Sequence, residues 1–386
     1  MTDSELRMKI LFVLNSFYTI GNGLAASARR TAQALKDLGE EVRVLSGPNH
    51  NPDGPQPDYL LKDFYFPIFQ PLIRAHGYQF ASTDMKILEE AIRWADVVHM
   101  QEPFVLEIRA AKMARKLGKP VTGTYHLHPE NIFYSIGMGG WKFPNRVMLN
   151  IWRDWCFNHW SHLQCPTQNV MDRLERIGCT SQLHVISNGI VPDESIRQPQ
   201  ENHPYLVACI GRLAGEKDQL TLLEAMKYCR HAHEIQLVFA GRGPQEKKTR
   251  RTAARFYKKG ILTYNPSFEF MNREELRQLG AKADLFIHCA IAEVEGLSIM
   301  EAMQQGGVPV IASGPNTGAC QFALDQRSLF RQHDARELAQ KIDWWLDHPQ
   351  ERKEAQLRYT ESMKEYEISK SVKTLVQMFQ KAIDQQ

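Results

Sequence analysis

The segment Glu293–Glu301, with the sequence EVEGLSIME, carries two carboxylates separated by seven residues on either side of a glycine. It follows the apolar run LFIHC and opens a helical pattern of apolar residues, so one carboxylate falls in a loop and the other in the first turn of a helix. A helix N-terminus binds diphosphate well, whereas the carboxylates suit hydroxyls of a sugar or ribose. The same spacing also fits an ordinary helix with a solvated acid before it.

Two cations follow another predicted strand, in the segment GRLAGEK that contains Gly211, Arg212 and Lys217. A strand end with two cations five residues apart can neutralise a diphosphate and stabilise the charge that develops as it departs. Arg212 suits two oxygens at once, and Lys217 acts as a point charge. Alternatively, both are solvated loop residues.

Two shorter patterns lie nearer the N-terminus. Gly21-Asn22-Gly23 follows the first strand, and small residues there let the backbone approach a ligand or form a tight turn. Thr124-Tyr125-His126, with His128, ends a later strand, and a histidine there can bond a sugar hydroxyl or move a proton. A structural histidine fits equally, and no third ligand completes a metal site.

The elements that position these residues alternate between strands and helices. Buried strands are predicted at 10–14, 97–100, 121–125, 162–165 and 183–186, and, beyond a polar linker at 192–204, at 206–210, 237–240, 285–289 and 308–311. Helices are predicted between them, at 85–94, 106–117, 220–226 and 274–283 among others, and helices alone follow residue 335, the last at 369–383. This order predicts parallel sheets that bind ligands at the carboxyl ends of their strands.

Composition narrows the function. A chain of 386 residues exceeds what one core usually supports, which predicts two domains. The net charge of +3 is too small to indicate nucleic-acid binding without a concentrated basic face. Seven cysteines without a C-x-x-C pair suggest neither disulfides nor zinc, and a polar start without a signal peptide or membrane span predicts a cytoplasmic protein.

Aromatic side chains gather in two places that can meet an acceptor or a membrane. Residues 64–80 include Phe66 and Phe69, and residues 141–160 contain four tryptophans together with basic residues. A helix after Pro144 would place Met148, Trp152 and Trp155 on one face, beside Trp141 at its start; tryptophan and cations favour a headgroup boundary. The other interpretation packs this helix into the core or beside an acceptor.

Six landmarks in order give the chain a family resemblance. They are the glycine loop at Gly23, Thr124–His126, ISNGI at Ile186–Ile190, GR with Lys217, AGRGP at Ala240–Pro244, and Glu293-x7-Glu301 followed by AMQQGGVPVIAS. Together they resemble the retaining glycosyltransferases of family 4, which have the GT-B fold. The variants EVEGLSIMEAM, TYHLHPE and KIDWWLDHP are most similar to the bacterial branch that contains cholesterol α-glucosyltransferases and diacylglycerol glycosyltransferases.

The resemblance implies an α/β architecture of two Rossmann-like domains that face each other across a cleft. An acceptor-binding domain would span residues 1–195, a nucleotide-sugar-binding domain 205–365, and a helix at 366–386 would pack back on the first. It implies donor contacts from Gly23, Gly211, Arg212, Lys217, Gly243, Glu293, Gly296, Leu297, Ser298 and Glu301, with His126, Arg212, Lys217 and Glu293 as the catalytic set. Where many members have Gly-Phe-Gly after the first glutamate, this chain has Val294-Glu295-Gly296.

The function so implied is transfer of a hexose, glucose from UDP-glucose, to a hydroxyl of a lipid such as a sterol or diacylglycerol. The donor is a substrate, and without an aspartate pair of D-x-D type no metal or other cofactor is required. The enzyme would sit peripherally on the inner face of the cell membrane, through its N-terminal domain. Transfer to a polysaccharide or soluble acceptor, epimerisation of a nucleotide sugar on the same fold, and non-catalytic sensing of a nucleotide sugar remain alternatives.

Overall fold

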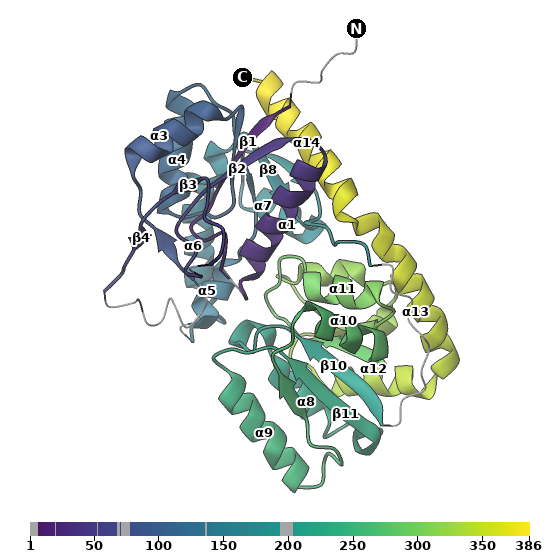
Figure 1. Ribbon diagram of the computed structural model, residues 1–386. Coiled ribbons are helices and arrows are strands. Elements are labelled where there is room, and N and C mark those ends of the chain that lie inside the picture. The colour runs from purple at the N-terminus through teal and green to yellow at the C-terminus, as the bar shows by residue number, and fades with distance from the viewer. Residues whose placement is uncertain are drawn as a thin grey trace. The chain divides into compact units, whose positions relative to one another are not determined.

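A computed structural model describes residues 7–19, 21–51, 53–67, 70, 78–135, 137–193 and 204–386 of the chain. The chain divides into two compact units, each with its own core and its own parallel sheet (Figure 1). The first unit comprises Met1–Pro129, Lys142–Gly189 and Ile368–Gln386, and the second comprises Glu130–Trp141 and Ile190–Glu367. The predicted α/β class, with two Rossmann-like units, is confirmed.

The sheet of the first unit has the strand order β3-β2-β1-β6-β7-β8-β9, and every neighbouring pair is parallel. Strand β1 lies inside this sheet, and its residues Ile10, Leu11, Phe12 and Val13 are almost fully buried because helices cover both faces. The strands are β1 (Lys9–Val13), β2 (Glu41–Ser46), β3 (Tyr59–Leu60), β6 (Val97–Met100), β7 (Val121–Thr124), β8 (His162–Cys165) and β9 (Gln182–Val185).

Helices α1 (Gly23–Asp37), α3 (Met85–Trp94), α4 (Val105–Lys116), α6 (Lys142–Trp155) and α7 (Gln168–Arg176) belong to this unit. So does the final helix, α14 (Ile368–Asp384), which packs against α1 and β8. Its apolar stripe, including Val372, Leu375 and Phe379, is buried, and the Phe379 ring meets His99 of β6 edge-on at 4.9 Å. The first unit is therefore built from segments at both ends of the chain.

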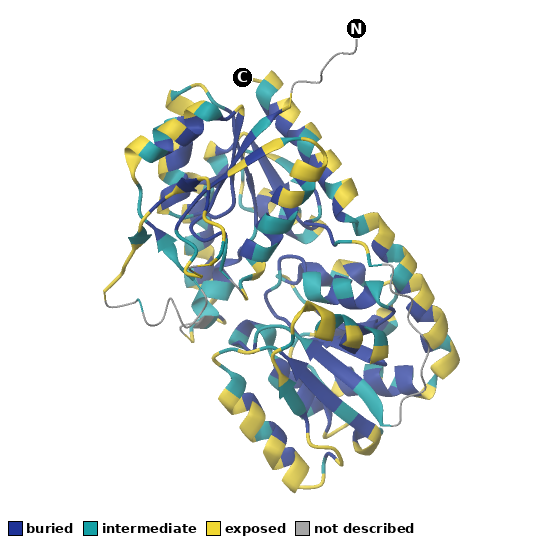
Figure 2. Cartoon of the chain, viewed as in Figure 1, coloured by how far each residue is buried: buried dark blue, intermediate teal, exposed yellow. Residues whose placement is uncertain are grey.

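The sheet of the second unit is also parallel, with the order β12-β11-β10-β13-β14-β15. Its strands are β10 (Tyr205–Ile210), β11 (Ile235–Ala240), β12 (Ser267–Glu269), β13 (Leu285–His288), β14 (Val308–Ser313) and β15 (Leu329–Arg331). Its helices are α5 (Pro129–Ser135), α8 (Gln219–Ala225), α9 (Glu246–Lys258), α10 (Arg273–Lys282), α11 (Leu297–Gln304), α12 (Ala335–Asp347) and α13 (Pro349–Met363). Strands β10 and β11 are largely buried, while α9 turns exposed residues outward (Figure 2).

The segment Glu130–Trp141 lies between β7 and β8 of the first sheet in sequence, but its contacts place it in the second unit. Asn131 Nδ2 donates a hydrogen bond to Ala292 O at 3.3 Å, and Asn316 Nδ2 donates one to Glu130 Oε1 at 3.2 Å. The sequence pattern assigned this segment to residues 1–195 because it lies between two strands of the first sheet. Within the described residues, no helix is long and apolar enough to cross a membrane.

The predicted strands and helices agree with the structure within two residues at nearly every boundary. The short strands β3, β12 and β15 and a two-stranded hairpin, β4 (Asp63–Phe64) and β5 (Phe80–Ala81), were not predicted. Two or three residues give too little periodicity to be recognised. Most of the predicted linker at 192–204 lies outside the described residues.

Candidate active site

The carboxyl ends of β10 and β11 carry two glycine loops that touch each other. Gly211 and Gly241 have φ angles of 143° and 148°, which L side chains rarely adopt, and Gly211 N donates to Ala240 O at 2.9 Å. A Cβ atom at Gly241 would collide with Gly211 O, and one at Gly243 would collide with Leu213 O. These glycines therefore let the two loops close together at the edge of the sheet where ligands bind.

Arg212 follows Gly211 at this edge, and its side chain is bound by the buried Glu216. Its guanidinium donates to Glu216 Oε1 at 2.5 Å, and the Glu216 side chain is only 2 % exposed. Gln219 Nε2 donates to the Arg212 carbonyl at 2.9 Å, which fixes the backbone of the loop. Arg212 is thus a positioned cation that is one-quarter exposed, rather than a freely solvated loop residue.

Lys217 and Glu293 come from different loops and form an ion pair, Nζ to Oε2. His288, the last residue of β13, places Nε2 at 3.3 Å from the same Glu293 oxygen. Burial raises the pKa of Glu293, but the Lys217 charge and the contact with His288 outweigh burial, so the pKa lies far below its usual value. Glu293 is therefore a carboxylate at neutral pH.

The loop that carries Glu293 is clamped by backbone hydrogen bonds. Glu293 N donates to Asn316 O at 2.9 Å, and Gly318 N donates to Glu293 O at 2.7 Å. Gly296 then turns the chain with a φ of 99° and caps α11, whose first residues are Leu297 and Ser298. Helix α11 begins at Leu297, four residues after Glu293, and its N-terminus carries a partial positive charge.

Glu295, which departs from the family pattern, is buried, with 2 % of its surface exposed. Burial raises the pKa of Tyr366, and the Glu295 charge raises it further. The buried Glu295 carboxylate therefore interacts electrostatically with Tyr366. Glu301 and Ser298 instead line a small cavity of about 60 Å³ together with Ile210 and Arg273. Glu301 is thus accessible to a small ligand group.

The first unit holds the two other donor-site candidates, Gly23 and His126. Gly23 begins α1, which Asn22 caps by accepting hydrogen bonds from Leu24 N and Ala25 N. His126 Nε2 lies 2.8 Å from Gln101 Oε1, and burial lowers its pKa to about 3. The imidazole is therefore neutral, donating through Nε2 and leaving Nδ1 as an acceptor.

The predicted aromatic surface needs one correction. Trp155 and Trp141 are exposed by 63 % and 60 %, but Trp152 is 4 % exposed and packs edge-on to Phe104, so placing it on the surface was wrong. Phe66 is partly exposed between Phe64 and Phe80, and Phe69 lies outside the described residues. The exposed face of α6 is the row Phe143, Val147, Ile151 and Trp155, which we call the α6 apolar row.

Three residues of this site were not singled out in the sequence. His288 touches Glu293, Glu216 holds Arg212, and Asn316 accepts the Glu293 backbone hydrogen bond through its carbonyl oxygen. His288 ends a predicted strand, and Glu216 lies inside GRLAGEK, so strand-end position was the available signal. Asn316 lies in a loop after β14, and nothing in the sequence links it to Glu293.

The sequence of this chain is similar to those of known glycosyltransferases. The descriptions "Glycosyltransferase Family 4" and "Glycosyl transferases group 1" match residues 21–194 and 192–366. The chain is 24 % identical to the α-monoglucosyldiacylglycerol synthase of Streptococcus pneumoniae, over 80 % of this chain and 71 % of that protein. It is 36 % identical to the catalytic domain of Helicobacter pylori cholesterol-α-glucosyltransferase, over 42 % of this chain and 99 % of that one, with a TM-score of 0.40.

The fold has a further match along nearly the whole chain. Anabaena HepE, solved in complex with UDP and glucose, has a TM-score of 0.69 at 16 % identity, covering 97 % of this chain and 100 % of that one. At that identity the likeness concerns the fold. With the two family descriptions together matching residues 21–366, this chain belongs to the family 4 glycosyltransferases and has their GT-B fold.

Proposed function

We propose that this glycosyltransferase is a retaining hexosyltransferase that moves glucose from UDP-glucose to a hydroxyl of a lipid such as a sterol or diacylglycerol. The second unit binds the nucleotide sugar and the first binds the acceptor. The proposal depends on the Lys217–Glu293 ion pair and on Arg212, which is fixed by Glu216 in the same loop as Lys217. These residues offer cations for a diphosphate and a carboxylate for sugar hydroxyls at one edge of the sheet.

The cations supply the electrostatic part of the reaction. In the proposed complex, Arg212 and Lys217 bind the diphosphate, and the backbone of Gly296, Leu297 and Ser298 adds amide dipoles. As the bond from the anomeric carbon to phosphate oxygen breaks, negative charge grows on the departing UDP. Fixed cations stabilise that charge without reorganising, which lowers the barrier to transfer.

The carboxylates grip the neutral parts of the donor. Glu293 is ionised, so it accepts hydrogen bonds from hydroxyls of the transferred sugar and does not deliver a proton. Glu301, in its small cavity, accepts from the ribose hydroxyls. His126 contributes a neutral imidazole that contacts the sugar. Gly23, Gly211 and Gly243 let backbone approach the donor closely.

Retention requires the acceptor hydroxyl to attack on the face that UDP leaves. The acceptor oxygen forms its bond to the anomeric carbon as the phosphate bond breaks, and a phosphate oxygen of the leaving UDP takes the hydroxyl proton. This step uses no enzymic nucleophile. Catalysis then consists of holding the two substrates together and stabilising the leaving group.

The lipid acceptor is supported by the similarity to a diacylglycerol glucosyltransferase and by the α6 apolar row. Four apolar side chains at four-residue spacing are exposed by 40 to 78 %, with exposed Lys142 and Arg146 on the same helix. Such a face suits the boundary of an anionic membrane. We therefore propose peripheral attachment to the inner face of the cell membrane through α6.

Mass spectrometry tests donor and acceptor together. Purified protein is incubated with UDP-glucose, UDP-galactose and GDP-mannose in the presence of dispersed diacylglycerol, cholesterol and oligosaccharides. A hexosylated lipid formed from UDP-glucose, with an α-anomeric proton by NMR, supports the proposal. A hexosylated oligosaccharide alone favours the soluble acceptor, isomerised free UDP-sugar favours an epimerase, and a β-linked product contradicts retention.

A further inference from the structure

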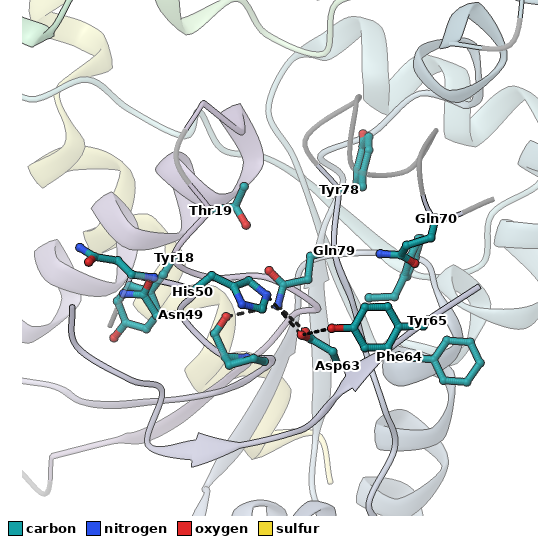
Figure 3. A pocket seen from close by; sticks show the side chains of 13 residues that line it. Tyr18, Thr19, Asn49, His50, Asp63, Phe64, Tyr65, Gln70, Tyr78 and Gln79 are labelled. Atoms are coloured by element: carbon teal, nitrogen blue, oxygen red, sulfur yellow. Dashed lines mark hydrogen bonds and ion pairs between the residues drawn. The ribbon is translucent and has the colours of Figure 1, made fainter. Parts of the chain in front are cut away.

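A cavity of about 480 Å³ opens in the first unit, and none of its lining residues is assigned above to the donor. It lies beside the hairpin β4–β5 and the loops that follow β1 and β2. Its walls include Tyr18, His50, Asp63, Tyr65, Gln79 and Phe80 (Figure 3). Its volume falls within the range of small-molecule sites, roughly 300 to 1,000 Å³.

Asp63 is the polar centre of this cavity. Gln79 Nε2 donates to Asp63 Oδ1 at 2.7 Å, Tyr65 OH donates to Oδ2 at 3.2 Å, and His50 Nε2 lies 3.3 Å from Oδ2. These three side chains converge on the carboxylate from separate segments (Figure 3). A carboxylate offers about four acceptor positions, so it can accept a ligand hydroxyl beside them.

Hydrogen bonds to the backbone of the neighbouring strand fix the position of Asp63. Asp63 pairs with Ala81 across the hairpin, and Ala81 N donates to Asn15 Oδ1 at 3.1 Å. Asn15 is in turn held by the buried Glu102, which accepts from Asn15 N at 2.7 Å and from Nδ2 at 2.9 Å. The cavity wall is therefore anchored to the ends of β1 and β6, which makes it a preformed site.

Aromatic rings form part of the lining, and Phe66 and Phe17 pack against lining rings from outside it. The rings of Phe64, Phe66 and Phe80 meet edge-to-face at 4.8 and 5.4 Å, and Tyr18 contacts Phe17 at 5.0 Å. Two lining rings, those of Phe64 and Tyr65, are about half exposed. The cavity therefore has a polar surface, formed by Asp63, Gln79 and His50, and an apolar surface formed by the aromatic rings.

We propose that this cavity binds a hydroxyl-rich group, a polyol or sugar ring, as the head of the acceptor. This inference rests on the proposed transferase function and narrows its acceptor. A sugar or glycerol offers several hydroxyls to Asp63, Gln79 and His50, while its C–H face covers an aromatic ring. The donor in the second unit uses different residues, so the cavity is a second recognition site.

The same lining disfavours the ring system of a sterol. A sterol carries one hydroxyl, and its hydrocarbon body would cover Asp63 without offering donors to the remaining acceptor positions of the carboxylate. Leaving buried polar groups unsatisfied costs about 1–3 kcal/mol each, more for a charged group. A site with this lining therefore selects the acceptor whose head supplies hydroxyls.

Binding without turnover gives the first test. Saturation-transfer NMR on the full chain, without nucleotide sugar, uses methyl α-D-glucopyranoside and glycerol as probes. Wild-type protein should show transfer to the probe, Asp63→Asn should weaken it about tenfold or more, and Tyr65→Phe should weaken it less. Asp37→Asn, an exposed position on α1, is the matched control and should match wild type. Absent binding, or equal binding by Asp63→Asn, overturns the proposal.

Turnover separates the two sources of such a head group. With UDP-glucose as donor, the KM for a glucosyl-diacylglycerol, a lipid whose head is a sugar, and for a soluble glucoside is measured in wild type, Asp63→Asn and Asp37→Asn. A raised KM for one acceptor in Asp63→Asn, with the donor KM unchanged, identifies the source. Probe binding at Asp63 with no turnover on any acceptor contradicts the transferase but keeps the site. Turnover with an unchanged acceptor KM contradicts the site alone. Thermal unfolding confirms that the variants are folded.

Discussion

Lys217 and Glu293 lie 76 positions apart in the chain, and their side chains form an ion pair at the carboxyl edge of the second sheet. Both are mostly buried, with 20 % and 16 % of their side chains exposed. A carboxylate held this way keeps its charge at neutral pH, and the lysine stays oriented. The pair is a preorganised electrostatic element, whose value for transfer can be measured by removing one partner.

Replacing Lys217 by alanine should lower the rate of glucosyl transfer about 100- to 1,000-fold, because one fixed charge on the departing diphosphate is lost. Single-turnover kinetics with UDP-glucose measures this step. Lys227→Ala is the matched control, since Lys227 forms an exposed pair with Glu224 on the same unit and should keep the wild-type rate. An unchanged rate in Lys217→Ala would remove this residue from the mechanism.

Replacing Glu301 by glutamine should weaken donor binding about tenfold or more while changing kcat little. A neutral amide keeps the shape of the side chain but accepts ribose hydroxyls less strongly than a carboxylate does. Isothermal titration with UDP reports the effect directly. The exposed Glu354 on α13 provides the control, Glu354→Gln. Wild-type UDP affinity in Glu301→Gln would exclude the ribose contact.

The two tryptophans of α6 should respond differently to substitution. Trp152→Ala removes a buried ring and should lower the free energy of unfolding by about 3–5 kcal/mol. Trp155→Ala lies on the exposed α6 apolar row and should change it by less than about 0.5 kcal/mol. Urea unfolding of both variants checks this contrast, and equal losses would contradict the burial described for α6.

The α6 apolar row also predicts membrane affinity. Phe143→Ser combined with Trp155→Ser should reduce cosedimentation with phosphatidylglycerol vesicles at least tenfold, because two exposed rings leave the interface. Leu357→Ser is a matched control, since Leu357 is an exposed apolar residue on α13 of the other unit. Vesicle binding that survives the double substitution would assign attachment to another surface.

Acidification should destabilise the first unit through two histidines. Burial lowers the pKa of His126 to about 3, and burial followed by the His126 charge lowers that of His99 to about 3, against 6.5 when unfolded. Between these values the unfolded chain binds more protons, so this stability is complete above pH 6.5 and is lost as pH falls toward 3. Each histidine contributes a slope of up to about 1.4 kcal/mol per pH unit. Urea unfolding at several pH values should show a shallower slope in His126→Asn, and an identical slope would contradict the assignment.

Much of the fold was predictable because buried parallel strands and amphipathic helices leave strong patterns. The run after Lys9 and the periodicity over Met85–Trp94 each correspond to an observed element. That Gly211, Lys217 and Glu293 lie near one another was predictable for the same reason, because they follow strands whose ends share one edge. Which acid pairs with which cation was not predictable, since spacing does not set side-chain direction.

The failures have physical causes. Trp152 and Trp155 were assigned to one face because three residues place them only about 60° apart around a helix, but packing against Phe104 buries Trp152 and leaves Trp155 exposed. The position of Glu130–Trp141 in the second unit depends on amide contacts such as Asn131 to Ala292, which leave no periodic signal. The cavity around Asp63 joins segments without a shared motif.

The place of α14 in the first unit bears on how the protein is made. Residues Ile368–Gln386 cover hydrophobic surface on α1, β6 and β8, yet they leave the ribosome after the whole second unit. Until then the first unit has its sheet without this cover. The second unit consists of Ile190–Glu367 and the earlier segment Glu130–Trp141, so all of it has been synthesised before α14. The second unit can therefore finish folding before the first, although synthesis of the first unit begins earlier.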